Sequence, residues 1–322
     1  MINLGTPDEA SPAAVRKYLG QFLSDRRVVE IPPLVWQPIL RGIILRTRPK
    51  KSAHAYKQVW TEGGSPLAAI TAAQAAALKQ AYGPFVTVDF AMRYGQPAIG
   101  ARINALKAAG CTRILLAPLY PQYCAATTAT ANDEAFRALA AMRWQPAIRT
   151  LPPYYEDGRY IAALKDSVEE QLAELDFRPD AVVASFHGMP ERTLHLGDPY
   201  HCHCQATARL LGEALKPTLG DRELIIAFQS RFGRAKWLEP ATDKVLAELP
   251  GKGIRKVAIL APGFSADCLE TLEELAIRGR ETFEAAGGER FAYLACLNDS
   301  AGGMKMLRSI IGTELDGWVS HS

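Results

Sequence analysis

Two stretches of similar pattern, "KAAGCTRILLAPLY" (107–120) and "GKGIRKVAILAPGF" (251–264), decide which fold the chain takes. In each, a glycine and a basic residue precede a short apolar run, which ends in Ala-Pro with an aromatic residue two places later. A continuous apolar run of this length is typical of a strand that is buried on both faces of a parallel sheet. The recurrence of the pattern in the two halves of the chain predicts two similar α/β domains.

Other apolar runs alternate with longer segments at helical spacing, and this alternation predicts parallel sheets covered by helices on both faces. The further strand candidates are "MINLG" (1–5), "FVTVDFAM" (85–92), "AVVASF" (181–186) and "ELIIAFQS" (223–230). Prolines interrupt the pattern near 144–160. We therefore expect two Rossmann-like α/β domains over 1–147 and 148–300, followed by a C-terminal segment over 301–322.

The composition excludes several classes of protein. The 322 residues are 48% hydrophobic and 22% charged, which is typical of a globular protein with a sizeable core. A formal net charge of +3 is too small to indicate a nucleic-acid partner. The first residues show no signal-peptide pattern, and no run has the ~18–20 apolar residues of a membrane span. We expect a cytoplasmic protein whose six cysteines are reduced thiols.

Polar and aromatic side chains follow nearly every predicted strand, where open α/β sheets bind their ligands. They include Arg93, Tyr94, Tyr120, Gln122, Tyr123, His187, Gln229, Ser230, Arg231, Phe264, Asp267 and Glu270. Sheets that point these ends at one cleft would line a large pocket with aromatic walls and a few ionisable groups. No GxGxxG follows a strand and no GxxxxGK[ST] is present, so a nucleotide site is not expected.

His187 follows an apolar strand and stands in the turn-rich stretch "SFHGMP" (185–190). One interpretation is a hydrogen-bonded structural residue. The other is a neutral imidazole that accepts a proton near pH 7 or binds a metal ion. The residues alone leave both interpretations open.

The stretch "SADCLETLEEL" (265–275) places Asp267, Glu270 and Glu274 on one face of a predicted helix, at i, i+3 and i+7. They could form a helix start, with Asp267 as the N-cap, Glu270 as the N3 residue of a capping box and Glu274 solvated. They could instead form a line of carboxylates that carries cations or protons from a cleft to water. The spacing does not distinguish the two.

Two further segments also have two interpretations. The stretch "EIPPLVWQPILRGIILRTRPKK" (30–51) is either a buried helix with a basic end or a lip that meets a planar ligand or a membrane surface. In "PYHCHCQ" (199–205), Cys202 and Cys204 have the chemistry of metal ligands, but no second CxxC or CxC accompanies them. The aromatic residues Phe232 and Trp237 belong either to the core or to a ligand platform.

Taken together, the motifs resemble the ferrochelatase family, in order and over nearly the whole chain. The matching motifs are "NLGTP" (3–7), "YLGQFLSDRRVVEIP" (18–32), "EGGSPL" (62–67), "MRYGQP" (92–97), "PLYPQY" (118–123), "SFHGMP", "GDPY" (197–200), "FQSRFG" with "WLEP" (228–240) and "APGFSADCLETLEEL" (261–275). The resemblance implies a porphyrin-binding cleft between two similar α/β domains. It also implies that the C-terminal helix packs back on the first domain.

The resemblance further implies a metal chelatase of the lyase class that inserts Fe²⁺ into protoporphyrin IX in the last step of haem biosynthesis. His187 and Glu270 match the catalytic residues, which also contact the substrate metal, and Asp267 and Glu274 match a proton or metal path. The porphyrin-binding residues would be Leu4, Arg93, Tyr94, Tyr123, Ser230, Trp237 and Phe264. Leu4, where the coproporphyrin branch carries a tyrosine, and "PLYPQY" favour protoporphyrin.

Several alternatives stay open beside this hypothesis. A coproporphyrin ferrochelatase or a cobalt chelatase would use the same chemistry, and a non-catalytic two-domain ligand-binding protein would have the same α/β pattern. The resemblance requires no cofactor beyond the substrate Fe²⁺. A [2Fe–2S] cluster on Cys124, Cys202 and Cys204 is a weaker hypothesis, because the cysteine-rich C-terminal extension of some family members is missing. Peripheral contact with the inner membrane is a further expectation from residues 34–51.

Overall fold

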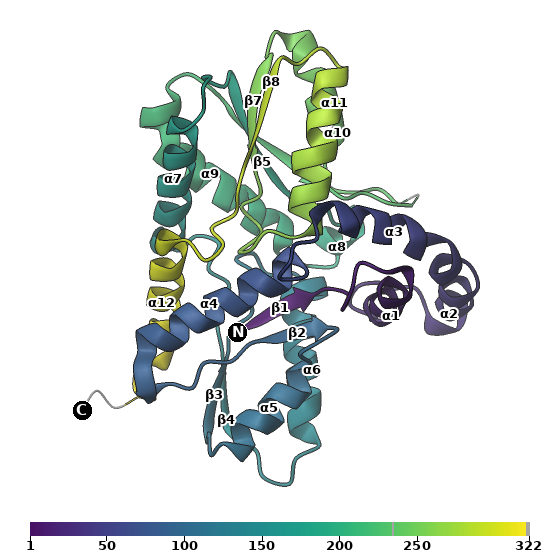
Figure 1. Ribbon diagram of the computed structural model, residues 1–322, viewed down its shortest axis with the longest axis vertical. Coiled ribbons are helices and arrows are strands. Elements are labelled where there is room, and N and C mark those ends of the chain that lie inside the picture. The colour runs from purple at the N-terminus through teal and green to yellow at the C-terminus, as the bar shows by residue number, and fades with distance from the viewer. Residues whose placement is uncertain (234, 320–322) are drawn as a thin grey trace. The chain divides into compact units, whose positions relative to one another are not determined.

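A computed structural model describes residues 1–233 and 235–319. The chain divides into two compact units (Figure 1). Unit 1 contains Met1–Tyr120, Cys124–Pro152 and the stretch from Leu307 onward, and unit 2 contains Pro121–Tyr123 and Pro153–Met306.

Unit 1 is built on four short parallel strands. They are β1 (Ile2–Gly5), β2 (Ala91–Tyr94), β3 (Arg113–Leu116) and β4 (Ala147–Thr150). β1 pairs with β2, and β3 pairs with β4. The amide of Ile2 donates to the carbonyl of Ala117 at 2.8 Å, and the amide of Leu119 donates to the carbonyl of Ile2 at 2.9 Å. The two pairs are separate two-stranded sheets, and these bonds connect β1 to the residues that follow β3, which gives the order β2, β1, β3, β4 across the unit.

Helices of unit 1 cover this sheet and extend beyond it. They are α1 (Pro12–Phe22), α2 (Pro33–Ile39), η1 (Leu40–Ile44), α3 (Leu45–Val59), α4 (Pro66–Tyr82), η2 (Gly83–Phe85), α5 (Ile99–Ala108), η3 (Ala125–Ala129) and α6 (Thr130–Ala140). The core beneath α5 and α6 contains Ile2, Ile99, Ile114 and Leu116. Helix α12 (Ala301–Leu315) ends in this unit, where Arg149 donates to the carbonyl of Glu314 at 2.7 Å.

Unit 2 has four parallel strands in the order β6, β5, β7, β8. They are β5 (Ala181–His187), β6 (Leu224–Gln229), β7 (Lys256–Leu260) and β8 (Arg290–Leu294). Its helices are α7 (Gly158–Ala173), α8 (Glu191–His195), α9 (Tyr200–Leu219), α10 (Thr242–Glu248), η4 (Pro250–Lys252), η5 (Glu270–Gly279) and α11 (Arg280–Ala285). The first six residues of β5 are fully buried, as expected for a strand covered on both faces.

The two units therefore share one strand order, with the second strand at the edge, then the first, the third and the fourth. This confirms the prediction of two similar α/β domains with parallel sheets. The predicted strand at 85–92 is wrong in its extent, because β2 begins only at Ala91 and Phe85 lies exposed in η2. Among the described residues, no helix is long and apolar enough to cross a membrane.

Candidate active site

Strand β5 of unit 2 delivers His187 to the carboxyl end of the sheet, where it pairs in register with Gln229 of β6. The imidazole Nδ1 lies 2.7 Å from the carbonyl oxygen of Gly188. A carbonyl oxygen only accepts hydrogen bonds, so Nδ1 carries the proton of the neutral ring. Nε2 is then left as a proton acceptor or metal ligand, because the bond made by one ring nitrogen fixes the role of the other.

The glycine after His187 is required by the neighbouring strand. The amide of Gly188 donates to the carbonyl of Gln229 at 2.7 Å, and a Cβ at Gly188 would lie 2.5 Å from that oxygen. Only glycine allows the two backbones to approach so closely. The next residues are held as well, since the amide of Leu238 donates to the carbonyl of Met189 at 2.9 Å. The turn therefore fixes the direction of the imidazole.

The acidic segment begins beside this histidine. Glu270 is the first residue of η5, which is a π-helix, and its backbone carbonyl accepts a hydrogen bond from Gln229 Nε2 at 2.8 Å. The other amide atom of Gln229, Oε1, accepts from the buried hydroxyl of Ser185 at 2.7 Å. Gln229 thus ties the start of the acidic helix to the strand that pairs with His187. From the sequence, Gln229 was only one of many polar residues that follow predicted strands, and this linking role was not predicted.

Glu274 lies one turn beyond Glu270, and its carboxylate interacts with the side chains of Ser230 and Arg278. The hydroxyl of Ser230 donates to Glu274 Oε2, and Arg278 Nη2 lies 3.3 Å from Glu274 Oε1. The pKa of Glu274 is raised above its ordinary value, chiefly because the carboxyl group is buried and also because Glu270 is nearby. The hydrogen bond from Ser230 and the charges of His187 and Arg278 lower the pKa and offset part of this shift. The charges of both Glu270 and His187 therefore act on the carboxyl group of Glu274. Ser230 supports the group from a left-handed backbone conformation, with φ of 67°.

The structure contradicts one of the two interpretations of Asp267, the helix cap. The capping-box interpretation is wrong. The helix begins at Glu270, so the N-cap position belongs to Leu269 and not to Asp267, and no side chain caps the helix. Asp267 is buried in the preceding loop. Its carboxylate accepts from the side chains of Thr271 at 2.9 Å, Tyr293 at 2.5 Å and Asn298 at 2.7 Å. Both oxygens are engaged inside the fold, so Asp267 does not continue a helical face shared with the two glutamates.

The aromatic candidates of unit 2 have different surroundings. Trp237 is nearly buried, and its indole nitrogen donates to the backbone carbonyl of Phe232 at 3.0 Å. The centroids of the Trp237 and Phe232 rings lie 5.0 Å apart. Phe232 is exposed, so it extends the aromatic surface toward solvent. Phe264 is half-buried and packs partly against the core under β7. The amide of Tyr123 donates to His203 Nδ1 at 3.1 Å.

A second group of candidates lies in unit 1, at the carboxyl ends of β1 and β2. Arg93 Nη2 donates to Asp25 Oδ2 at 2.5 Å, and the hydroxyl of Tyr94 donates to the same oxygen at 2.8 Å. The Tyr94 ring is only 2% exposed and packs edge-on against Phe22. Leu4 is half-buried on β1. Asp25 lies within the family-like stretch "YLGQFLSDRRVVEIP" (18–32), but nothing in that stretch reveals that its carboxylate pairs with Arg93.

The three candidate cluster cysteines do not form a metal site within either unit. Cys202 and Cys204 lie two residues apart on α9, so they point to different faces; Cys202 is exposed and Cys204 is buried. Cys124 is buried in unit 1. Across 1–233 and 235–319, no three His, Cys, Asp or Glu side chains converge as metal ligands. Cys202 and Cys204 therefore do not point from α9 toward one shared metal ion.

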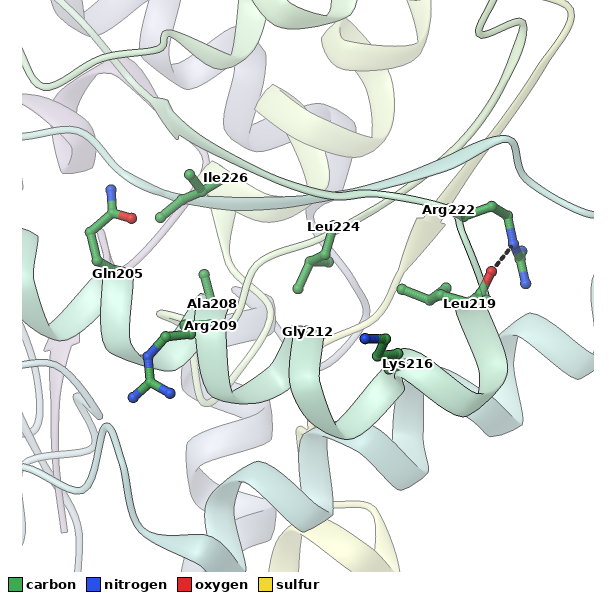
Figure 2. Close-up of a pocket in the computed structure, with 10 residues that line it drawn as sticks. Gln205, Ala208, Arg209, Gly212, Lys216, Leu219, Arg222, Leu224 and Ile226 are labelled. Carbon is green, nitrogen blue, oxygen red and sulfur yellow. Dashed lines mark hydrogen bonds between the residues drawn. The ribbon is translucent and has the colours of Figure 1, made fainter.

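A cavity of about 410 Å³ lies elsewhere in unit 2, between helix α9 and the edge strand β6 (Figure 2). Its lining includes the basic side chains of Arg209, Lys216 and Arg222 together with Leu224 and Ile226. Arg222 is held by backbone carbonyls at the end of α9, among them that of Leu219 at 2.8 Å. None of the candidate catalytic or porphyrin-binding residues lines this cavity.

The family model described as Ferrochelatase matches residues 1–315. The ferrochelatase of Rhizobium meliloti (strain 1021) is 52% identical over 323 residues, which cover 99% of this chain and 95% of that protein. The ferrochelatase of Agrobacterium fabrum is 52% identical over 325 residues, covering 99% and 93%.

Two solved structures share the fold at low sequence identity. SirB from Bacillus subtilis with Fe³⁺ has a TM-score of 0.56 and 17% identity, covering 79% of this chain and 93% of that one. CbiX, described as the terminal enzyme for siroheme biosynthesis in denitrifying bacteria, has a TM-score of 0.52 and 18% identity, covering 79% and 95%. Because the family model and half-identical relatives span nearly all of the sequence, the chain belongs to the ferrochelatase family.

Proposed function

We propose that this chain inserts Fe²⁺ into protoporphyrin IX to form protohaem, and that His187 and Glu270 carry the reaction. The observation that supports this most directly is the tautomer of His187. Its Nδ1–H is committed to the carbonyl of Gly188, so Nε2 is a proton acceptor at the end of the sheet, beside Glu270 and Glu274.

The chemistry requires two protons to leave the porphyrin as the metal enters. Fe²⁺ loses water ligands and forms bonds to the ring nitrogens, while two pyrrole N–H bonds break and two protons are released. His187 Nε2 takes a proton as general base. The carboxylate of Glu270 contacts the metal or accepts a proton from His187. Glu274, whose pKa burial raises, passes protons onward because it holds them more readily than a solvated carboxylate.

The remaining candidates would contact the macrocycle. Trp237, Phe264 and Tyr123 of unit 2 would supply aromatic or apolar surface, and Leu4 and Arg93 of unit 1 would supply an apolar contact and a hydrogen-bond donor. Aromatic side chains suit a flat porphyrin because they bury a large area at low conformational cost. Tyr94 would act through the packing of Arg93, because its own ring is buried.

A titration followed by absorbance tests this function. Free-base protoporphyrin IX should bind, and its spectrum should convert to that of protohaem only when Fe²⁺ is added anaerobically. Unchanged free-base bands with Fe²⁺ would indicate a binding protein without chelatase activity. A higher kcat/KM for coproporphyrin, or faster insertion of Co²⁺ than of Fe²⁺, would reverse the substrate assignment.

We expect this activity without a [2Fe–2S] cluster, because the cysteines of α9 point to different faces. Anaerobically purified protein should lack the visible charge-transfer bands of such a cluster. Bands that appear in the wild type and vanish in Cys202→Ser would contradict this expectation.

Peripheral contact with an anionic lipid surface is proposed for the segment around α2 and η1. Leu34 is 92% exposed, and Val35 and Ile43 are also exposed. The basic residues Arg46 and Arg48 follow closely on α3 and are exposed as well. Apolar side chains beside basic ones are typical of interfacial segments that bind anionic membranes. Trp36 does not belong to this surface, because it is half-buried and donates to the carbonyl of Leu23 at 2.6 Å.

Vesicle flotation tests the contact without changing the fold. The double variant Leu34→Ser with Val35→Ser should lose association with vesicles that contain anionic lipid. Phe85→Ser is the matched control, because Phe85 is another exposed apolar residue of unit 1. Equal flotation of wild type and double variant would show that the segment does not contact lipid.

A further inference from the structure

We propose that Asp25 is a positioning residue for Arg93: it holds the guanidinium in one orientation and balances its charge, so that unit 1 presents a single directed donor to the porphyrin. This inference rests on the proposed function, because it assigns Arg93 a contact with the porphyrin. It extends that function by adding a residue that neither the motifs nor the family match had assigned to the site.

Asp25 lies in the turn after α1, and its carboxylate accepts hydrogen bonds from three distant residues of unit 1 and from one neighbouring amide. Oδ2 accepts from Arg93, Tyr94 and the hydroxyl of Thr130, and Oδ1 accepts from the amide of Arg27 at 2.8 Å. The Asp25 side chain is only 10% exposed and that of Arg93 is 17% exposed. Hydrogen bonds to charged groups in such sheltered surroundings are stronger than those on the surface.

Arg93 is held on two of its three nitrogens. Nη2 donates to Asp25, and Nε donates to both the carbonyl and the hydroxyl of Thr130, at 3.0 and 2.7 Å. The guanidinium also lies over the Tyr94 ring, with Cζ 4.4 Å from its centroid. Nη1 makes no hydrogen bond to any residue that the structure describes. Because the guanidinium is planar and rigid, fixing two nitrogens fixes the direction of the third.

The ion pair between Asp25 and Arg93 also changes the net charge at this place in unit 1. An arginine alone would repel Fe²⁺, whereas a guanidinium beside a carboxylate is close to neutral. Burial raises the pKa of Asp25, but the hydrogen bonds from Thr130, Arg27 and Tyr94 and the charge of Arg93 outweigh it and lower the pKa overall. Asp25 therefore stays ionised at neutral pH, and Arg93 remains a donor without an excess charge.

A double-mutant cycle tests whether Asp25 acts through Arg93. The variants are Asp25→Ala, Arg93→Ala and the double variant, measured for kcat, for the two KM values and for porphyrin affinity by fluorescence quenching without iron. We expect each single change to lower kcat/KM for porphyrin by about tenfold or more, the loss typical of a charged hydrogen bond. The double variant should be no worse than Arg93→Ala alone. Additive losses would overturn the proposal.

Further variants separate positioning from general stability. Asp25→Asn keeps a hydrogen-bond acceptor and loses the charge, so it should recover part of the porphyrin affinity while raising the KM for Fe²⁺. It replaces Asp25→Ala in the cycle if that variant does not fold. Asp133→Asn, which removes an exposed partner of Arg27, is the control and should match wild type. If wild type itself neither binds nor metallates porphyrin, the proposed function fails. If wild type does both and the cycle is additive, only the role of Asp25 fails.

Discussion

The two units place different chemistry on the same scaffold. In each, a glycine ends or follows the first strand and lies against the backbone of the second strand. A Cβ at Gly5 would lie 1.8 Å from the carbonyl oxygen of Tyr94, and one at Gly188 would lie 2.5 Å from that of Gln229. The residues that follow Tyr94 and Gln229 both have positive φ, 82° at Gly95 and 67° at Ser230.

Leu4 of unit 1 and His187 of unit 2 each directly precede the glycine that packs against the second strand. The strand registers differ by one residue, because Gly5 pairs with Tyr94 whereas His187 itself pairs with Gln229. Before this glycine, one unit has an apolar side chain and the other an imidazole. The α/β scaffold thus places a different side chain before the glycine in each unit, and we propose that only the imidazole takes part in the chemistry.

The carboxylates differ between the units in a related way. Asp25 in unit 1 is paired with a sheltered arginine, whereas Glu274 in unit 2 faces Ser230, Glu270 and the half-exposed Arg278. A nearby cation favours the ionised form of a carboxylate, whereas burial and a second carboxylate favour its protonated form. The pKa of Asp25 is accordingly lowered and that of Glu274 is raised.

The largest expected effect comes from replacing, with alanine, the residue that precedes the packed glycine in each unit. His187→Ala should lower the rate of Fe²⁺ insertion by ~10²–10⁴-fold, the usual contribution of a general base, and leave porphyrin affinity nearly unchanged. Leu4→Ala should change affinity and leave the rate per bound porphyrin within about tenfold, since it removes only apolar contact. Stopped-flow metallation with separate fluorescence binding measures both. Similar rate losses for the two variants would break the comparison.

The next effect separates Glu270 from Asp267 on the same segment. Glu270→Gln should lower kcat by about 10²-fold with little change in Tm, because it removes a proton or metal contact and no helix cap. Asp267→Asn should instead lower the free energy of unfolding by about 1–3 kcal/mol, because three side chains donate to the buried carboxylate. If Glu270→Gln stays active while Asp267→Asn loses turnover without losing stability, the two roles are reversed.

The glycine pair sharpens the comparison through stability. Gly5→Ala should destabilise more than Gly188→Ala, because the clash is closer and φ at Gly5 is 109°. We expect about 1–3 kcal/mol for Gly188→Ala, as for other overpacked sites. Of the two, Gly188→Ala should cost more activity per folded molecule, since it displaces His187. Urea unfolding gives the first ranking and metallation rates give the second; an equal loss of activity would show that the turn does not aim the imidazole.

The smallest expected effect is a pH dependence of opposite sign in the two units. The folded pKa of Asp25 lies below 3.8, so its contribution to stability is present above pH 3.8 and is lost as the pH falls through the folded pKa. The folded pKa of Glu274 lies above 4.5, so ionising it costs stability as the pH rises from 4.5 through the folded pKa. Below 4.5 that cost is absent.

Thermal unfolding across pH measures both effects. Asp25→Asn should be less stable than wild type at pH 7, and the difference should shrink below pH 3.8. Glu274→Gln should be more stable than wild type at pH 7 and equal to it near pH 4. The same sign for both variants at pH 7 would show that the two carboxylates are held alike.

Much of the fold was accessible from sequence because burial on both faces leaves a simple signal. The run "AVVASF" (181–186) has to be apolar along its length, and the repeated Ala-Pro-aromatic ends reveal the duplication. The extent of β2 was not accessible, because "FVTVDF" has strand-like composition but begins on an exposed turn. The π-helical form of the acidic segment was also missed, because Glu270 and Glu274 suit an ordinary helix equally well by spacing.

The sequence by itself determined the parallel α/β architecture, the end of β5 as the place of His187, and membership of a chelatase-like family, because each depends on local pattern and on motif order. Only the tertiary structure decided which ring nitrogen of His187 is the acceptor, that Asp267 is engaged in the fold, and that Asp25 holds Arg93. Hydrogen-bond partners set these properties, and those of Asp25 lie 68 residues away at Arg93 and 105 away at Thr130. No local pattern specifies such pairs, because folding brings them together only after the apolar strands and helices have packed.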